Sequence, residues 1–269
     1  MNSLRLLLCG LVIGTLAACQ PPGGGSSSHL QRILASGELR VGMTGSQPPL
    51  NMTSKSGVIM GLEVDVVQAL AESMKLELRL VTFPFAELLT ALERGEVDLV
   101  ISGLTITPER NARVAFVGPY LISGKSVLTK SERIANVESS AALNDPEHSY
   151  AALAGSTGEE FVRNVLPKSK LVTSPDYDGA IKMVLDDQVD ALVADFPICM
   201  LSVMRYPDAG LSALTTPFTL EPLGIALPPD DPLFVNLVDN YMETLEQTGL
   251  LTQFKAKWFS HGDWLAELP

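Results

Sequence analysis

Two segments of this chain follow the same plan: the end of an amphipathic helix, an acidic turn, a Val-Asp pair and a short apolar strand. They are residues 92–102 (LERGEVDLVIS) and 184–194 (VLDDQVDALVA). Short apolar strands that alternate with amphipathic helices are typical of α/β proteins. The chain has 269 residues, 46% of them hydrophobic, a size that allows two domains with cores of their own. The repeat therefore predicts two α/β halves.

The alternation of strands and helices starts near residue 39 and restarts near Lys125. Predicted strands cover residues 39–43, 77–82, 99–102, 126–129, 151–154, 170–172, 191–194 and 223–227. Predicted helices begin at 61 and 196, cover 85–93, 158–166 and 177–185, and finish with a pair that ends near Trp258. Because a further strand follows the second set, we expect lobe 1 to comprise 29–123 and 219–269, and lobe 2 to comprise 124–218. The crossovers near Ser123 and Pro217 are the expected hinges.

The first 28 residues have the composition of a targeting signal and a tether. Arg5 precedes an apolar run at 6–16 that is too short to span a bilayer but suits a signal peptide. The run ends in Leu-Ala-Ala-Cys at 16–19, which resembles a bacterial lipobox. We expect a signal peptide at 1–18, a lipid on Cys19 and a flexible tether over 19–28. The alternative is an ordinary signal peptide with an incidental cysteine.

Composition argues against several classes of function. The formal net charge of −12 disfavours nucleic acid as a partner, because an acidic surface repels phosphates. Three histidines and three cysteines are scattered without the spacing of zinc ligands, so we expect no metal. After loss of Cys9 and lipidation of Cys19 only Cys199 remains, and we interpret it as a buried small hydrophobe. No phosphate-binding or nucleophile-elbow motif is present, and no cofactor is expected.

Polar residues follow the ends of the two repeated strands. Ser102, Gly103 and Thr105 follow the first strand, and Asp195 follows the second. Ligands of open α/β sheets bind outside the carboxyl ends of the strands. We therefore expect a ligand cleft between the lobes.

Arg110 lies just beyond the first of these strand ends. The sequence places it in a short helix that Thr107 caps and Pro108 begins. From there its guanidinium can bend back over the strand end and hold a carboxylate with two hydrogen bonds. The alternative is a surface arginine that pairs with Glu109.

The segment Gly155-Ser156-Thr157-Gly158 follows a predicted strand and opens a helix. Free backbone amides at a helix start bind anions. Glu159 and Glu160 would repel a doubly charged phosphate, so a carboxylate is the expected anion. The alternative is a plain capping turn, in which Thr157 and Glu160 form a capping box.

Several motifs occur together in an order that resembles one known family. They are GELRVG at 37–42, Pro-Pro at 48–49, GLEVDV at 61–66, GEVDLVISGLTITPER at 95–110, FVGPY at 116–120, Gly-Ser-Thr at 155–157, Val-Asp-Ala at 189–191 with Asp195, and Gly249 with Lys-Trp-Phe at 257–259. Together they resemble the bacterial extracellular solute-binding proteins of family 3, the polar amino-acid receptors of ABC importers. The resemblance implies a type II periplasmic-binding-protein-like fold: two α/β lobes, two crossover strands and a ligand cleft.

The resemblance also implies roles for individual residues. Arg110 would hold the α-carboxylate of an amino acid, and Asp195 would bind its α-ammonium group from the opposite lobe. The other implied ligand contacts are Thr105, Ser156 and Thr157 at the carboxylate, Ser102 and Gly103 at the ammonium group, and Phe85 and Gln47 in the side-chain pocket. Gln47 stands where many members carry an aromatic residue, which leaves the specificity open.

The implied function is capture of an amino acid by lobe closure and its delivery to an ABC transporter permease. The protein would be a monomer in the periplasm or at the cell surface, with no nucleic acid partner and with membrane contact through Cys19 alone. One alternative is an enzyme on the same scaffold, similar to the cyclohexadienyl (prephenate or arogenate) dehydratases. Glu159 would then be the general acid that protonates a leaving hydroxyl. A free-standing ligand sensor is the other alternative.

Overall fold

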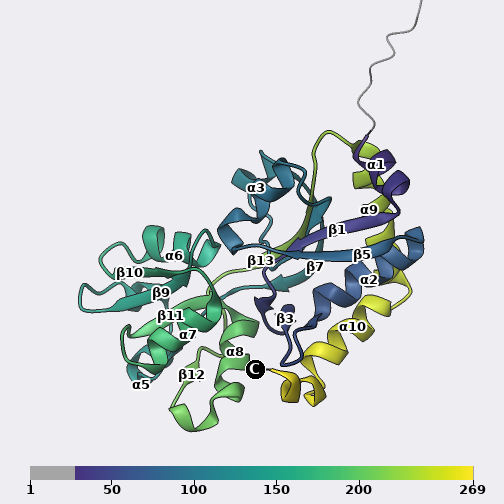
Figure 1. Ribbon diagram of the computed structural model, residues 1–269. Coiled ribbons are helices and arrows are strands. Elements are labelled where there is room, and N and C mark those ends of the chain that lie inside the picture. The colour runs from purple at the N-terminus through teal and green to yellow at the C-terminus, as the bar shows by residue number, and fades with distance from the viewer. Residues whose placement is uncertain (1–27, 269) are drawn as a thin grey trace, which may run out of the picture.

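A computed structural model of the chain describes residues 28–268 (Figure 1). The predicted signal peptide at 1–18, the predicted lipidation site Cys19 and the tether up to residue 27 lie outside these residues. Within 28–268, no helix has both the length and the apolar character needed to cross a bilayer.

The first lobe is built around a five-stranded sheet with the strand order β5-β1-β6-β13-β7. The strands are β1 (Glu38–Met43), β5 (Glu77–Thr82), β6 (Leu99–Val100), β7 (Ala115–Ser123) and β13 (Glu221–Leu227). β1 pairs in parallel with β5 and β6, whereas β13 pairs antiparallel with β6 and β7. A late segment of the chain thus returns to complete this sheet.

Helices cover this sheet, and a small second sheet lies beside it. The helices are α1 (His29–Ser36), α2 (Leu62–Met74), α3 (Leu88–Glu93), α4 (Pro108–Asn111), α9 (Pro232–Gln247) and α10 (Leu250–Phe259), with 3₁₀ turns η1 (Phe85–Glu87) and η4 (Asp263–Glu267). The small sheet contains β2 (Ser46–Gln47), β3 (Asn51–Thr53) and β4 (Ile59–Met60). α2 buries Leu62, Val66 and Leu70, a helical spacing that turns one apolar face to the core.

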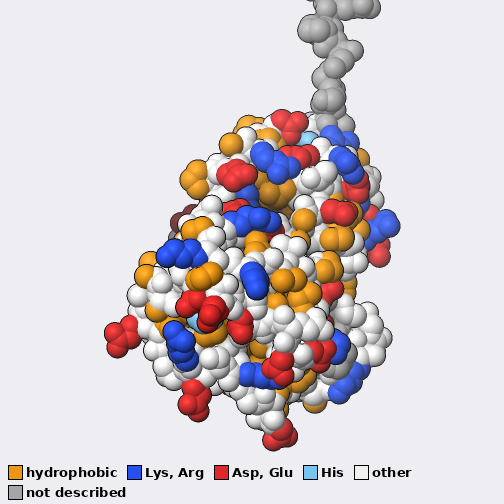
Figure 2. Space-filling view, turned by 90° about the vertical axis from the view of Figure 1, so that its left-hand side faces the viewer, with side chains coloured by type: hydrophobic (Ala, Val, Ile, Leu, Met, Phe, Trp, Pro, Cys, Tyr) orange, Lys and Arg blue, Asp and Glu red, His pale blue; other side chains and the backbone are white. Residues whose placement is uncertain are grey.

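The second lobe has its own five-stranded sheet, ordered β10-β9-β11-β8-β12. The strands are β8 (Lys125–Thr129), β9 (Ser149–Leu153), β10 (Lys170–Ser174), β11 (Ala191–Asp195) and β12 (Ser212–Ala213). The helices are α5 (Glu132–Ala135), α6 (Thr157–Val165), α7 (Tyr177–Leu185) and α8 (Phe196–Arg205), with 3₁₀ turns η2 (Ser140–Leu143) and η3 (Pro207–Ala209). Figure 2 shows acidic and basic side chains interspersed on the face that this lobe presents.

The two chain crossovers between the lobes touch each other at Gly124. β7 ends at Ser123, β8 begins at Lys125, and the return path runs through Thr219 into β13. A Cβ atom on Gly124 would lie 2.1 Å from the carbonyl oxygen of Thr219 and 2.7 Å from the Cβ of Pro217. The Lys125 amide also donates to Thr219 Oγ1 at 2.9 Å. Only glycine fits where the crossovers meet.

The lobes share part of their hydrophobic core. One buried cluster contains Phe85 and Leu104 from the first lobe together with Leu153 and Tyr177 from the second. Each lobe also has a cluster of its own. The lobes therefore pack against each other at the carboxyl ends of their strands (Figure 1).

The expected two-lobed α/β architecture is confirmed, and the predicted strands are all present, some with shifted ends. The prediction missed α1, α5, β7, β12 and the small sheet. β7 contains Gly118-Pro119 and has no regular alternation of buried and exposed residues, so it lacks the sequence pattern of a strand. The helix predicted at 85–93 is divided into η1 and α3.

Candidate functional site

Arg110 is buried at the junction of the lobes. Thr107 caps α4 as predicted, accepting from the Arg110 amide at 3.2 Å. The guanidinium donates from Nη1 to the carbonyl oxygen of Thr105 at 3.0 Å and from Nη2 to that of Gly155, in the other lobe, at 3.1 Å. Its carbon lies 5.6 Å from the centre of the Phe85 ring. A guanidinium has five N–H donors, so others remain for a ligand.

Burial lowers the pKa of Arg110, while nearby carboxylates act in the opposite direction. The carboxylates are those of Glu160, Asp195, Glu221 and Glu109. An arginine remains charged at any ordinary pH. The site therefore holds a largely desolvated cation, which suits a carboxylate ligand.

The loop before α6 faces Arg110 from the second lobe. Ser156 is the N-cap of α6, accepting from the Glu159 amide at 3.2 Å and donating to the Leu153 carbonyl at 2.7 Å. The capping box predicted with Thr157 is therefore wrong, because the helix begins one residue earlier. The Thr157 hydroxyl instead lies 3.2 Å from that of Thr105 in the opposite lobe.

Glu159 is occupied within its own helix. Its Oε2 accepts from the Gly155 amide at 2.8 Å, and its Oε1 accepts from Arg163 Nη2 at 2.6 Å. The structure gives Glu159 a positioning role for the 155–159 loop.

Asp195 ends β11 and is buried with a partner that the sequence analysis missed. Its Oδ1 lies 2.6 Å from Nζ of Lys125, the residue directly opposite in β8. Glu221 Oε2 lies 3.8 Å from the same Nζ. The sequence signal that could have predicted this pair was Lys125, which directly precedes an apolar predicted strand. A lysine is almost never fully buried without a partner, so its position calls for a nearby carboxylate.

The predicted residues Ser102 and Gly103 belong to a hydrogen-bonded network in the first lobe. Ser102 Oγ accepts from the Thr44 amide at 3.0 Å and from Asn51 Nδ2 at 3.3 Å. The Gly103 amide donates to Glu63 Oε1 at 2.7 Å, and Gly103 has a φ of +59°. The network holds the end of β6 against the loop after β1.

Gln47 packs directly on Gly103. A Cβ atom on Gly103 would lie 2.6 Å from Gln47 Oε1, the end of a flexible side chain, and the positive φ of Gly103 favours glycine at this position. Gln47 is buried, and its Nε2 has no hydrogen-bond partner among the residues that the structure describes. It therefore presents an unused donor beside the predicted site.

Glu63 is the centre of the first-lobe network and was missed by the sequence analysis. It is fully buried and accepts from Asn51 Nδ2 at 2.5 Å, from the Gly103 amide and from the Tyr120 hydroxyl. Burial raises the pKa of Glu63 although these hydrogen bonds act against the shift. The folded protein therefore binds this proton more tightly than the unfolded chain does.

A pH-dependent stability follows from Glu63. Its contribution is fully present below its unfolded pKa of about 4.3 and is lost as the pH rises through the higher pKa of the folded protein. We expect the free energy of unfolding to fall with rising pH across this window, and Glu63→Gln to remove that part of the slope. Urea unfolding at a series of pH values measures it, with Glu72→Gln on the exposed face of α2 as the control. Parallel pH profiles for wild type and Glu63→Gln would contradict the assignment.

Three cavities adjoin these groups. One of about 240 Å³ is lined by Phe85, Arg110, Gly155 and Glu160. Another of about 440 Å³ lies at Thr44, Phe85 and Asp176. A third, of about 340 Å³, is lined by Thr105, Thr157 and Glu221 among others. Of the predicted contacts, the structure thus brings Arg110, Phe85, Thr105 and Thr157 together.

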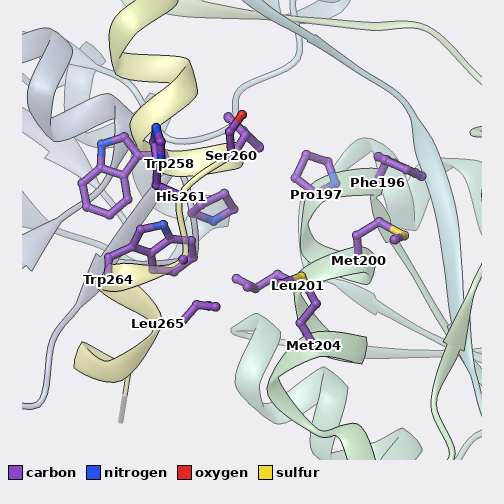
Figure 3. A pocket seen from close by; sticks show the side chains of 13 residues that line it. Phe196, Pro197, Met200, Leu201, Met204, Trp258, Ser260, His261, Trp264 and Leu265 are labelled. Carbon is purple, nitrogen blue, oxygen red and sulfur yellow. The ribbon is translucent and has the colours of Figure 1, made fainter.

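A further, mostly apolar pocket of about 330 Å³ opens between α8 and the C-terminal segment. In Figure 3, Met200, Leu201 and Met204 of α8 face Trp264 and Leu265 across it. An amino acid needs charged partners for both of its charged groups, and these side chains offer none. The polar groups around Arg110 are therefore the better candidate site.

Cys199 is fully buried in α8. Burial raises the pKa of its thiol to about 12. A thiol of that kind is not a nucleophile at neutral pH, in agreement with the interpretation from sequence.

The family model of the bacterial extracellular solute-binding proteins, family 3, matches residues 39–261. A cyclohexadienyl dehydratase of Pseudomonas aeruginosa is 30% identical over 234 residues, which cover 87% of each chain. A probable histidine-binding protein of Neisseria gonorrhoeae is 25% identical over 97% of each chain. The ABC transporter arginine-binding protein 1 of Escherichia coli is 24% identical over 84% of this chain and 92% of its own.

Solved structures agree with the type II periplasmic-binding-protein-like fold. An ancestral amino acid-binding protein, described as a precursor of cyclohexadienyl dehydratase, has a TM-score of 0.79 and 31% identity over 86% of this chain and all of its own. A binding component of an ABC transporter from Wolinella succinogenes, in complex with lysine, has a TM-score of 0.80 and 33% identity. This match covers 85% of this chain and 98% of the other.

Proposed function

Because the chain belongs to the bacterial extracellular solute-binding proteins of family 3, we propose that it captures an amino acid between its lobes and delivers it to an ABC importer. The observation that carries the proposal is the buried Arg110, which reaches the carbonyl of Gly155 across the lobe junction and keeps further donors for a carboxylate. Relatives named as histidine- and arginine-binding proteins support an amino acid as the ligand.

The two charged groups of an amino acid meet opposite charges in this proposal. Arg110 holds the carboxylate, with hydroxyls of Thr105, Ser156 and Thr157 nearby. Asp195, in the other lobe, takes the ammonium group near Ser102 and Gly103. Gln47 and Phe85 line the side-chain pocket. The interlobe contacts of Arg110 and Thr105 support a grip from both sides.

Lobe closure is part of the proposal. We place lobe 1 at 29–123 and 219–269 and lobe 2 at 124–218, with hinges at the crossovers. The close contact of the crossovers at Gly124 supports a short, compact hinge. Closure would exclude water and so strengthen both charged contacts.

A thermal-shift panel tests the proposed ligand class. The folded body from residue 28 onward is mixed with each common amino acid and with prephenate. A ligand present at about 100 times its Kd should add about 2.7 kcal/mol to the free energy of unfolding. We expect at least one amino acid to do so. A panel without any shift would reject the amino-acid proposal.

A dehydratase is the second candidate, and the Pseudomonas aeruginosa relative is the observation that favours it. The general acid predicted for it, Glu159, is instead bonded to Arg163 and Gly155, which supports the binding function. Incubation with prephenate separates the two functions. Turnover of prephenate would establish the enzyme, whereas unchanged prephenate would favour the binding function.

We place the protein in the periplasm or at the cell surface, anchored through a lipid on Cys19. The Leu-Ala-Ala-Cys run at 16–19 supports this anchor. A Cys19→Ser variant should leave the membrane fraction or keep its signal peptide. Unchanged membrane retention of that variant would contradict lipidation.

A further inference from the structure

Three ionised side chains are buried together where the crossovers meet the sheets. Lys125 is 1% exposed, Asp195 6% and Glu221 8%. Nζ of Lys125 lies 2.6 Å from Asp195 Oδ1 and 3.8 Å from Glu221 Oε2. One cation thus faces two carboxylates, and its short contact goes to Asp195. The cluster carries an excess of one negative charge.

Glu221 keeps an unused acceptor in this cluster. Its Oε1 accepts from the Thr219 hydroxyl at 3.0 Å, whereas Oε2 is buried and has no hydrogen-bond partner among residues 28–268. Ser123, directly opposite in β7, also has a buried hydroxyl without a partner in this part of the chain. A buried charged oxygen without a hydrogen bond is costly, so such an atom indicates a missing partner.

Glu221 lies within reach of the proposed ligand site. It lines the cavity that Thr105 and Thr157 also line, and those two hydroxyls lie 3.2 Å apart across the lobes. Glu221 and Asp195 are also two of the carboxylates that act on the charge of Arg110. The unused acceptor therefore sits near the proposed carboxylate anchor.

We propose that Glu221 binds the protonated amino group of the ligand. Asp195 takes part in this contact, but Lys125 already offsets the charge of Asp195. The ligand class is then a compound with a primary ammonium group next to a carboxylate. A ligand ammonium would cancel the excess negative charge of the cluster. This inference rests on the proposed function, and it makes Glu221 the residue that selects amino acids over plain carboxylates.

Calorimetric titration of two matched ligands tests the assignment. One is the amino acid with the largest thermal shift, and the other is its 2-hydroxy acid, which lacks the ammonium group. Glu221→Gln should weaken binding of the amino acid by about 30-fold or more, because the buried ammonium group loses the one of its two carboxylates that no lysine closely pairs. Binding of the hydroxy acid should change by less than about threefold. Glu132→Gln, an exposed carboxylate on α5 of the second lobe, is the control for long-range charge.

The melting temperature without ligand shows whether each variant folds. If Glu221→Gln does not fold, Glu221→Asp is the second variant, because it keeps the charge on a shorter side chain. It should still weaken binding of the amino acid more than binding of the hydroxy acid. An equal loss of affinity for both ligands would overturn the inference and assign Glu221 a structural role. Unchanged amino-acid binding would overturn it as well. If the wild type binds no amino acid at all, the proposed function fails instead.

Discussion

An Arg110→Met variant should lose nearly all affinity for the ligand. The substitution keeps an unbranched side chain over the Phe85 ring but removes the guanidinium, which leaves the ligand carboxylate desolvated and without a charged partner. Loss of one partner of a buried charge pair costs about 2–5 kcal/mol. The dissociation constant should therefore rise by about 30-fold to several thousand-fold in calorimetric titration.

Arg113→Met is the matched control for this variant. Arg113 lies three residues after Arg110, is exposed and pairs with Glu93 at 2.8 Å. Its removal should change affinity by less than about threefold, since exposed ion pairs contribute little. Arg110→Lys tests geometry separately, because a lysine keeps the charge but cannot form the two-pronged contact. Wild-type affinity in Arg110→Met would exclude Arg110 as the carboxylate anchor.

The second large effect concerns stability. Lys125→Met should lower the free energy of unfolding by about 3–5 kcal/mol, the usual cost of breaking a buried ion pair from one side. Asp195 and Glu221 would then lie buried without their cation. Urea unfolding at neutral pH measures the loss.

Lys130→Met provides the comparison, because Lys130 directly follows the strand that Lys125 begins. Lys130 is partly exposed and pairs with Asp187 at 3.0 Å. The Lys130→Met substitution should lower the free energy of unfolding by only about 0–1 kcal/mol. The double variant Lys125→Met with Asp195→Asn should recover part of the stability lost in the single variant. A Lys125→Met protein as stable as wild type would show that the cluster does not depend on its cation.

Local signals in the sequence were sufficient for the architecture and for the short helix that carries Arg110. Strand and helix periodicity located the repeating units, and the Thr107-Pro108 start predicted the short helix that carries Arg110. Such features depend on neighbouring residues alone, so they can be predicted from the sequence without knowledge of the fold. β7 was missed because Gly118-Pro119 interrupts that local pattern.

The buried ionic cluster could not be found in the same way. Lys125, Asp195 and Glu221 lie on β8, β11 and β13, and the first two meet only because antiparallel pairing places them opposite each other. Glu63 likewise reaches Gly103 and Tyr120 from a distant helix.

The sequence by itself thus determined the two α/β lobes and the placement of Arg110 at a strand end. Only the tertiary structure decided that Asp195 makes the short contact with Lys125, that Glu221 makes a longer one, and that Glu159 is held by Arg163 and the Gly155 amide. Secondary structure follows from short-range periodicity and capping. The state of a buried charge depends instead on partners that strand register and lobe packing bring from far along the chain.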